Sequence, residues 1–164
     1  MKLDVSTITK LSGRSMDVEF NGKIEALNDI VKDGKFDTVF LKGKLVNIDG
    51  VLELNGQIST KYRTGCYRCL KEVTKELSIK VSENFVREGS QTESDEYTYN
   101  ENYVELEQML IDNIVLHLPT RVLCSENCKG LCQKCGCDLN IKSCQCKEDN
   151  IDPRMETLKK FFES

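Results

Sequence analysis

The chain has 164 residues and a mass of 18.7 kDa, which corresponds to about one domain with room for a small appendage. Its net charge of −4 and pI of about 5.2 argue against an indiscriminate nucleic-acid binder, because such proteins usually carry enough basic residues to make the whole chain positive. Hydrophobic residues make up 39% and aromatic residues 7%, with no tryptophan, so we expect a modest apolar core in which metal cross-links would matter.

The sequence shows no pattern for secretion or for membrane insertion. The first seven residues, Met1–Thr7, lack the apolar core of a secretory signal. No apolar run approaches the roughly 20 residues of a membrane-spanning helix. We therefore expect a cytoplasmic protein with no membrane partner, in a compartment that keeps thiols reduced.

Residues 1–36 show little pattern and give no indication of function. Met16–Phe20 alternates apolar and polar side chains and is followed by Asn21 and Gly22, a pair typical of hairpin turns. We expect one short strand here.

Residues 38–58 predict a long antiparallel hairpin with one buried face. Apolar residues recur at every second position on both sides of a turn at Asn47–Gly50. Gly43 and Gly56 lie inside the strands and predict bends or bulges, as in a curled sheet. A third strand follows Cys66 and Cys69, so this cysteine pair is expected in a tight connection between two strands. Its inner face is expected to carry Val73, Leu77, Ile79, Val81 and Phe85.

The segment 88–107 contains seven acidic residues and no lysine or arginine. It is typical of a solvated loop, and the alternative is an acidic surface for a basic partner such as a ribosomal protein. From 103 to 118, apolar residues recur at three-to-four spacing, which predicts one long helix that ends before Pro119. Asp152 and Pro153 are typical of the start of a short last helix.

These elements predict an α+β fold, in which one long helix packs on a curled antiparallel β meander and a small cysteine-rich segment and a short C-terminal helix follow. The expected division is a β-rich core in residues 1–120 with its helix at 103–118, a zinc-binding cysteine cluster in 121–150, and the C-terminal helix in 151–164.

Nine cysteines dominate the chemistry of the sequence, and seven of them fall within residues 124–146. The C-x2-C spacing of Cys132 and Cys135 aims two sulfurs at one ion, and Gly136 lets the backbone fold back beneath it. An odd number of cysteines in a reducing compartment favours metal thiolates over disulfides.

Treating Cys137 as a spare leaves four pairs of cysteines, and four ligands per zinc ion then give two sites. The presence of a single histidine means that both would be all-thiolate. In an alternative pairing, 124/128 joins 132/135 and 66/69 stays free, so one or two structural zinc ions are expected. The simplest partition makes a local site of Cys132, Cys135, Cys144 and Cys146, and a long-range site of Cys66, Cys69, Cys124 and Cys128.

The cysteines belong to a set of motifs that is specific in combination. The set consists of Cys66-Tyr-Arg-Cys69-Leu70, Leu116-His-Leu118-Pro119, Cys128-Lys-Gly130-Leu131-Cys132-Gln-Lys-Cys135-Gly136 with Asp138-Leu139-Asn140, Cys144-Gln-Cys146, and Asp152-Pro153-Arg154 with Leu158. It covers about residues 38–162 and resembles the YceD-like family, whose members are called large ribosomal RNA subunit accumulation proteins. Some members lack the distal cysteines but keep the first pair, which implies two independent sites. Cys137 departs from the family pattern and receives no role.

The resemblance implies a non-enzymatic zinc-binding factor that supports accumulation of large-subunit rRNA and ribosome biogenesis. Its expected partner is that rRNA or a ribosomal protein, and no small-molecule substrate is expected. Candidate contacts are Tyr67, Arg68, Lys129 and Lys134, which flank the cysteines. The lysines would equally offset the charge of −2 that four thiolates leave on Zn²⁺.

The sequence is compatible with two other functions. A zinc-stabilised interaction module would bind a basic protein through the acidic segment. A thiol oxidoreductase would use Cys66 and Cys69, but such motifs need the first cysteine at a helix N-terminus, and the pattern predicts strands on both sides.

Overall fold

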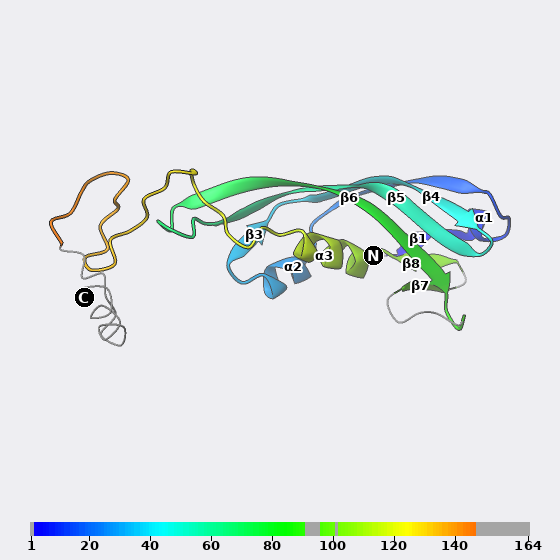
Figure 1. Cartoon of the computed structure of the whole chain (residues 1–164). Coiled ribbons are helices and arrows are strands. Elements are labelled where there is room, and N and C mark those ends of the chain that lie inside the picture. Colours follow the sequence, from blue (N-terminus) through cyan, green and yellow to red (C-terminus); the bar gives the residue numbers. More distant parts are fainter. Residues whose placement is uncertain (1, 91–95, 101, 147–164) are drawn as a thin grey trace, which may run out of the picture.

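A strongly curved, eight-stranded sheet forms the body of the computed structural model, which describes residues 2–90, 96–100 and 102–146 (Figure 1). The strand order is β1-β8-β7-β6-β5-β4-β2, and β3 pairs with β5. In chain order the elements are β1 (Lys2–Asp4), α1 (Ser6–Thr9), β2 (Ser15–Gly22), α2 (Glu25–Ile30), β3 (Gly34–Phe36), β4 (Val39–Ile48), β5 (Val51–Gly65), β6 (Glu72–Arg87), β7 (Tyr97–Asn100), β8 (Tyr103–Glu105) and α3 (Glu107–Leu116).

The predicted hairpin is the pair β4 and β5, and the predicted third strand is β6. The turn between β4 and β5 is Asp49-Gly50, with φ values of 51° and 93°, as a two-residue hairpin turn of the right twist requires. Gly43 and Gly56 face each other in an unbroken register, so there is no bulge at this point. A Cβ on either glycine would come within 2.7 Å of a carbonyl oxygen of the facing strand, so only glycine permits this close approach.

Apolar side chains on the concave face of the sheet form the main core. The short helices α2 and α3 lie against this face (Figure 1). Alternate residues of β4, β5 and β6 point into the core and the others point to solvent, as the period-two patterns predict. The largest fully buried side chains include Leu41, Leu45, Leu52, Leu54, Ile58, Phe85, Met109, Leu110 and Ile114.

The prediction of one long helix over 103–118 is wrong. Residues 103–105 form β8, which pairs with both β1 and β7, and the helix α3 has only 10 residues. The reason lies in residues 103–106, where exposed and buried side chains alternate with Val104 and Leu106 inside. These two apolar residues fit a strand as well as a helix. Hydrogen bonding of this segment to β1 and β7 favours the strand.

Three further expectations need correction. The sheet is not a purely antiparallel meander, because β7 runs parallel to β6 with Phe85 opposite Tyr97. Asn21 and Gly22 do not form a turn, since β2 continues through both and pairs with β4. The acidic segment, expected as a loop, contains β7 and β8, and Tyr99 is buried there.

The expected C-terminal helix at 151–164 lies outside the described residues. Within the described residues, every helix is too short or too polar to span a bilayer.

One buried polar group in the described part of the chain lacks a hydrogen-bond partner. This group is Oγ1 of Thr60, a residue of β5 that is only 4% exposed. A buried hydroxyl without a partner costs about 1–3 kcal/mol of desolvation.

We therefore expect Thr60→Val to raise the free energy of unfolding by about 1 kcal/mol, because it removes this hydroxyl at nearly constant shape. Urea denaturation measures the change. Thr74→Val, at an exposed position of β6, is the matched control and should change the free energy of unfolding by less than about 0.5 kcal/mol. A lower midpoint for Thr60→Val would mean that the hydroxyl stabilises the fold.

Candidate metal centre

Four cysteines from distant parts of the chain meet at one end of the sheet. Cys66 and Cys69 lie in the connection between β5 and β6, and Cys124 and Cys128 lie in the segment after α3. Their sulfur atoms all lie within 4.8 Å of one another. The Sγ atoms of Cys66 and Cys128 are 3.9 Å apart, and those of Cys69 and Cys124 are 3.5 Å apart. We call this set the proximal group.

These distances fit a tetrahedral thiolate site. Zn–S bonds of about 2.3 Å give sulfur–sulfur edges of about 3.8 Å, whereas a disulfide needs about 2.05 Å. Three of the four cysteines are buried, and Cys124 is exposed. The proximal group could therefore hold a metal ion once its thiols lose their protons.

The turn that carries Cys66 and Cys69 is a compact knuckle. The N–H of Cys66 donates to the carbonyl of Lys71 at 2.7 Å, and the N–H of Leu70 donates to the carbonyl of Cys66 at 2.9 Å. Closing this turn places Leu70 in the left-handed region, with φ of 60°. Leu70 is 72% exposed, so burial of its side chain contributes little free energy to offset the strain of this backbone conformation.

A second knuckle repeats the same hydrogen bonds. The N–H of Cys132 donates to the carbonyl of Cys137 at 2.9 Å, and the N–H of Gly136 donates to the carbonyl of Cys132 at 2.8 Å. Gly136 has φ of 68° and takes the place that Leu70 has in the first knuckle. Sequence reasoning identified the glycine here, but the equivalent strain at Leu70 gave no signal because leucine rarely adopts this conformation.

The second knuckle supplies half of a distal group. This group consists of Cys132, Cys135, Cys144 and Cys146, whose sulfur atoms also lie within 4.8 Å of one another. The structure thus brings together the same two sets of four that the simplest partition of the sequence proposes, and Cys137 is in neither set. Within the described residues, the pairing of 124/128 with 132/135 does not occur.

Short hydrogen bonds connect the two groups. Within the proximal group, the guanidinium of Arg68 donates to the Cys128 carbonyl at 2.7 Å. The Arg68 carbonyl accepts the N–H of Leu131, the residue before Cys132 of the distal group, at 3.1 Å. Asn140 accepts the N–H of Lys129 at 2.8 Å and places its amide nitrogen 3.5 Å from the sulfur of Cys128. The distal segment is therefore held against the proximal group by backbone and side-chain hydrogen bonds in addition to any shared contact with sulfur.

The thiols of each group have pKa values that diverge. Burial raises the pKa of Cys66, but backbone N–H groups of Cys69, Cys124 and Arg68 outweigh it and lower the value to about 6. Backbone N–H groups of Cys135 and Lys134 lower the pKa of Cys132 to about 6. For Cys69, the Lys71 N–H lowers the pKa, yet burial and the neighbouring thiols raise it to about 12. Four thiols so close cannot all ionise unless a cation neutralises them.

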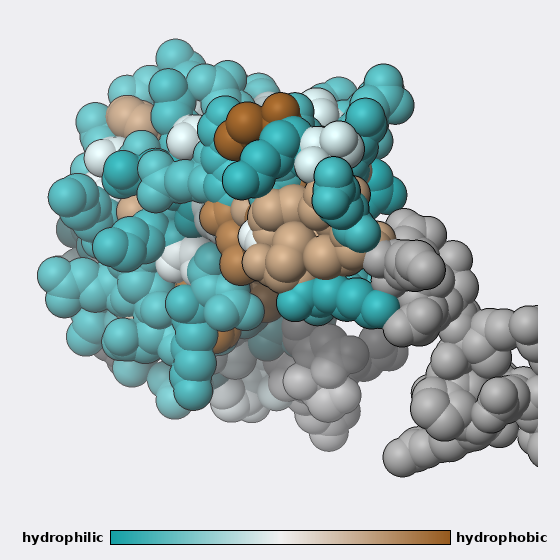
Figure 2. All heavy atoms as spheres, turned by 90° about the vertical axis from the view of Figure 1, so that its left-hand side faces the viewer, coloured by the Kyte–Doolittle hydropathy of each residue, from teal (hydrophilic) through white to brown (hydrophobic). Residues whose placement is uncertain are grey.

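The residues proposed as partner contacts differ in their surroundings. Tyr67 is 63% exposed, and the guanidinium of Arg121 lies 5.0 Å from the centre of its ring. Arg68 is engaged with the Cys128 carbonyl, whereas Lys129 and Lys134 are exposed. The stacking of Arg121 on Tyr67 could not be inferred from sequence, because these residues meet only when the proximal group assembles. Figure 2 shows this end of the molecule, where residues of hydrophobic character gather in the middle and hydrophilic residues surround them.

The two groups predict separate metal sites. We expect Cys132→Ser and Cys66→Ser each to lower the bound zinc by one equivalent, because each removes one ligand of a different tetrahedron. Elemental analysis of protein purified under reducing, chelator-free conditions measures the content. Cys137→Ser is the matched control and should keep all bound zinc. Unchanged zinc in Cys132→Ser would refute the distal site.

The strained knuckle predicts a stabilising change. Leu70→Gly should raise the stability of the zinc-loaded protein by about 1 kcal/mol, because glycine adopts φ of 60° without the left-handed penalty of about 1–2 kcal/mol. Gly136→Leu, at the equivalent position, should destabilise. Thermal unfolding with zinc present measures both, and a loss of stability in Leu70→Gly would show that the leucine side chain contributes more than the strain costs.

Comparison with known proteins shows which sequences this chain is similar to. Residues 54–162, which include both cysteine groups, match the family described as Large ribosomal RNA subunit accumulation protein YceD. Uncharacterized proteins of Mycobacterium bovis and Mycobacterium tuberculosis are each 32% identical over 117 residues, covering 67% of this chain and 55% of theirs. The protein YlbN of Bacillus subtilis is 24% identical, with 88% of this chain and 80% of YlbN covered.

The maize protein named Large ribosomal RNA subunit accumulation protein YCED homolog 1, chloroplastic, is 26% identical, with 65% of this chain and 50% of the maize protein covered. The chain thus spans about half the length of the mycobacterial and maize relatives that it matches. No solved structure matches it. Because the family match covers well over half of the sequence and both cysteine groups, the chain belongs to the YceD family of large ribosomal RNA subunit accumulation proteins.

Proposed function

We propose that this protein is a non-enzymatic, zinc-stabilised factor that supports accumulation of large-subunit rRNA during ribosome biogenesis in the cytoplasm. Family membership carries the ribosomal part, since the family description and the maize relative both name large-subunit rRNA accumulation. The two preassembled groups of four cysteines support the zinc part.

Zinc in this proposal is structural. Four thiolates complete a tetrahedron and leave no open coordination position for a substrate. An ion in the proximal group would fix the β5–β6 connection to the segment after α3, because Cys69 and Cys124 come from these two parts of the chain. An ion in the distal group would close the loop between Cys135 and Cys144. A reducing compartment, where thiolates persist, is part of the same proposal.

The proposed partner is large-subunit rRNA or a ribosomal protein, with no small-molecule substrate and no membrane. Tyr67, in the connection between β5 and β6, offers an exposed ring, and Arg121 offers a cation beside it. Lys129 adds a further exposed cation nearby in the sequence. Rings that stack on unpaired bases and cations that pair with phosphates are the usual means of RNA recognition.

A second function is favoured by one specific observation. Glu96, Glu105 and Glu107 line a hollow of about 520 Å³ beside β7 and α3. An acidic hollow suits a basic protein, so a zinc-stabilised interaction module is the alternative. A thiol oxidoreductase is less well supported, because Cys66 is 0% exposed and its sulfur could not reach a substrate disulfide.

Sedimentation of a tagged protein from gently lysed cells tests the ribosomal proposal. We expect the protein to migrate with large-subunit precursors and to be released by nuclease. Replacing Tyr67 and Arg121 together with alanine should weaken this association about tenfold or more without loss of zinc, since stacked aromatic contacts to bases are worth about 1–3 kcal/mol each.

The matched control replaces Tyr103 with alanine, because this tyrosine is also about half exposed but lies on β8. Migration at the top of the gradient for the unaltered protein would contradict the ribosomal proposal. Association that survives nuclease would favour a ribosomal protein as the partner.

A further inference from the structure

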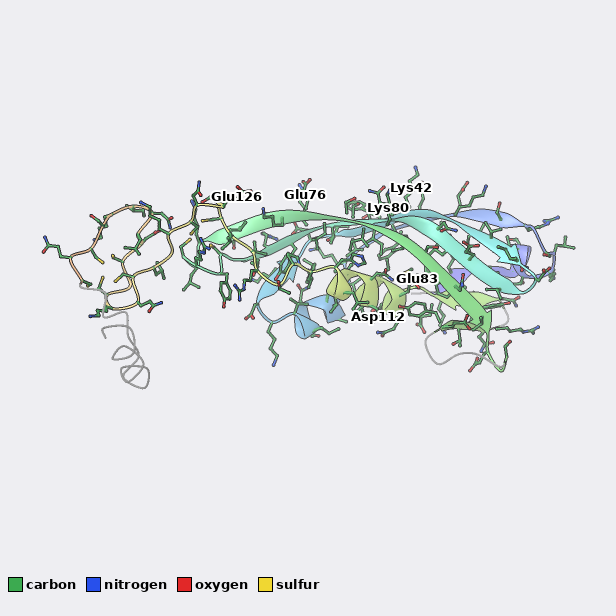
Figure 3. All side chains as sticks on the ribbon, viewed as in Figure 1. Lys42, Glu76, Lys80, Glu83, Asp112 and Glu126 are labelled. Atoms are coloured by element: carbon green, nitrogen blue, oxygen red, sulfur yellow. The ribbon has the colours of Figure 1, made fainter. Side chains whose placement is uncertain are left out.

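The convex face of the sheet carries a surface that the cysteine groups do not explain. This face is directed away from α2 and α3 (Figure 3). Figure 3 shows Lys42 and Lys80 on it, with β5 between their strands, while Glu83 and Asp112 lie on the opposite side. Alternate residues of β2, β4, β5 and β6 point outward here and are exposed to solvent.

Cross-strand register aligns these outward side chains in three adjacent rows, each four strands wide. Every residue of the three rows is exposed. From one row to the next, the residues are Asn21, Phe40, Ser59 and Ser78; Glu19, Lys42, Gln57 and Lys80; and Asp17, Lys44, Asn55 and Ser82.

The composition of these rows is unusual for a solvated sheet face. Over β4, β5 and β6 they contain three lysines, one aromatic ring, two amides and three hydroxyls, with no acidic residue. The two acids, Asp17 and Glu19, lie on β2 at the edge of the sheet. We call the part of the rows on β4, β5 and β6 the lysine face.

Charge on the lysine face is mostly not neutralised within the protein. Lys42 pairs with Glu19 at 3.3 Å, but both side chains are largely exposed and such pairs are worth little in water. Within the described part of the chain, Lys44 and Lys80 have no ion-pair partner. Three cations without an intervening acid match a chain of phosphates.

Two hollows open on this face and frame the rows. One, of about 520 Å³, is lined by Phe40, Ser59 and Ser78, together with Lys23, Lys61, Asp37 and Glu76. The other, of about 640 Å³, contains Lys42, Lys44 and Lys80 with Asn55 and Gln57. The acids beside the first hollow are engaged, since Glu76 pairs with Lys61 and Asp37 with Arg63.

We propose that the lysine face binds single-stranded RNA, with Phe40 stacking on an unpaired base while Lys42, Lys44 and Lys80 contact phosphates. The proposal rests on the ribosomal role proposed above and adds a second RNA-binding surface, on the sheet, to the contact proposed for Tyr67 and Arg121. Phe40 is 46% exposed, which leaves its ring available for a base. Gln57 donates to Ser78 Oγ at 2.6 Å and Asn55 donates to Glu53 at 2.7 Å. Their amide oxygens and the hydroxyls of Ser59 and Ser82 supply hydrogen-bonding groups for base edges and 2′-hydroxyls.

The same chemistry disfavours a protein as the occupant of this face. Protein interfaces have an apolar centre that is depleted of charge, whereas Phe40 is the single apolar side chain of the three rows. A polar, wet and positively charged surface is typical of nucleic-acid interfaces. Single strands are favoured over duplexes because a stacking ring requires an unpaired base.

Fluorescence anisotropy with the full zinc-loaded chain and an unstructured RNA of about 12 nucleotides tests the proposal. Lys42, Lys44 and Lys80 changed together to glutamine should weaken binding at least tenfold. The slope of log K against log salt should fall in magnitude by about 2, because three phosphate contacts on a single strand contribute about 0.7 each. Phe40→Ala should weaken binding about tenfold with the slope unchanged.

Lys2, Lys10 and Lys32 changed together to glutamine form the matched control, because they are exposed and lie outside the lysine face. This variant has the same net charge as the lysine-face variant and should bind RNA like the unaltered protein. Equal weakening in both triple variants would overturn the proposal, as would full binding by Phe40→Ala or no RNA binding by the unaltered protein.

Failure of this proposal is distinguishable from failure of the ribosomal role. If the protein migrates with large-subunit precursors but the purified chain binds no single-stranded RNA, the ribosomal role stands and the lysine face does not bind RNA. If RNA binds at the lysine face but the protein does not migrate with precursors, the surface stands and its ribosomal assignment fails.

Discussion

The pairing of β5 with β6 is the constraint on which the rest of this structure depends. The two strands remain in register from Leu52 opposite Phe85 to Gly65 opposite Glu72. Their side chains alternate between core and solvent from Leu52 to Tyr62 and from Leu77 to Phe85. One face of this hairpin supplies the centre of the core, and the other face supplies two strands of the lysine face. Its tip is the knuckle with Cys66 and Cys69. Core, proposed RNA surface and proximal group are therefore parts of one continuous backbone unit.

The proximal group converts this hairpin into an anchor for the rest of the chain. The segment after α3 has little secondary structure in the described residues, so its position depends on specific contacts with the knuckle. The N–H of Tyr67 donates to the Val122 carbonyl, Arg68 joins Cys128 and Leu131, and the sulfurs complete the connection. A divalent cation would strengthen all of these contacts, because it removes the mutual repulsion of thiolates held less than 5 Å apart.

The two knuckles have the same backbone conformation although their sequences differ. Both close with the same pair of hydrogen bonds and both need a left-handed residue after the second cysteine. Gly136 meets this need without strain, whereas Leu70 meets it against its own preference. The strained knuckle is the one that is tied to the sheet on both sides, so the surrounding structure holds it in place. Strain at Leu70 is thus a consequence of tertiary structure.

The sequence by itself determined β4, β5, β6 and the turn between β4 and β5, because period-two alternation and an Asp-Gly pair are local signals. Cysteine spacing indicated metal ligands and two groups of four as the simplest partition, but only the structure selected this partition over the alternative pairing. The sequence left other features open or gave the wrong answer. Val104 and Leu106 suit a helix or a strand, and only the edges of β1 and β7 decided for β8. Likewise, Phe40, Lys42 and Lys80 form one surface, and Arg121 stacks on Tyr67, only because cross-strand register and the proximal group bring distant residues together. Local periodicity fixes what a segment can become, whereas contacts between distant segments decide which surface it helps to build.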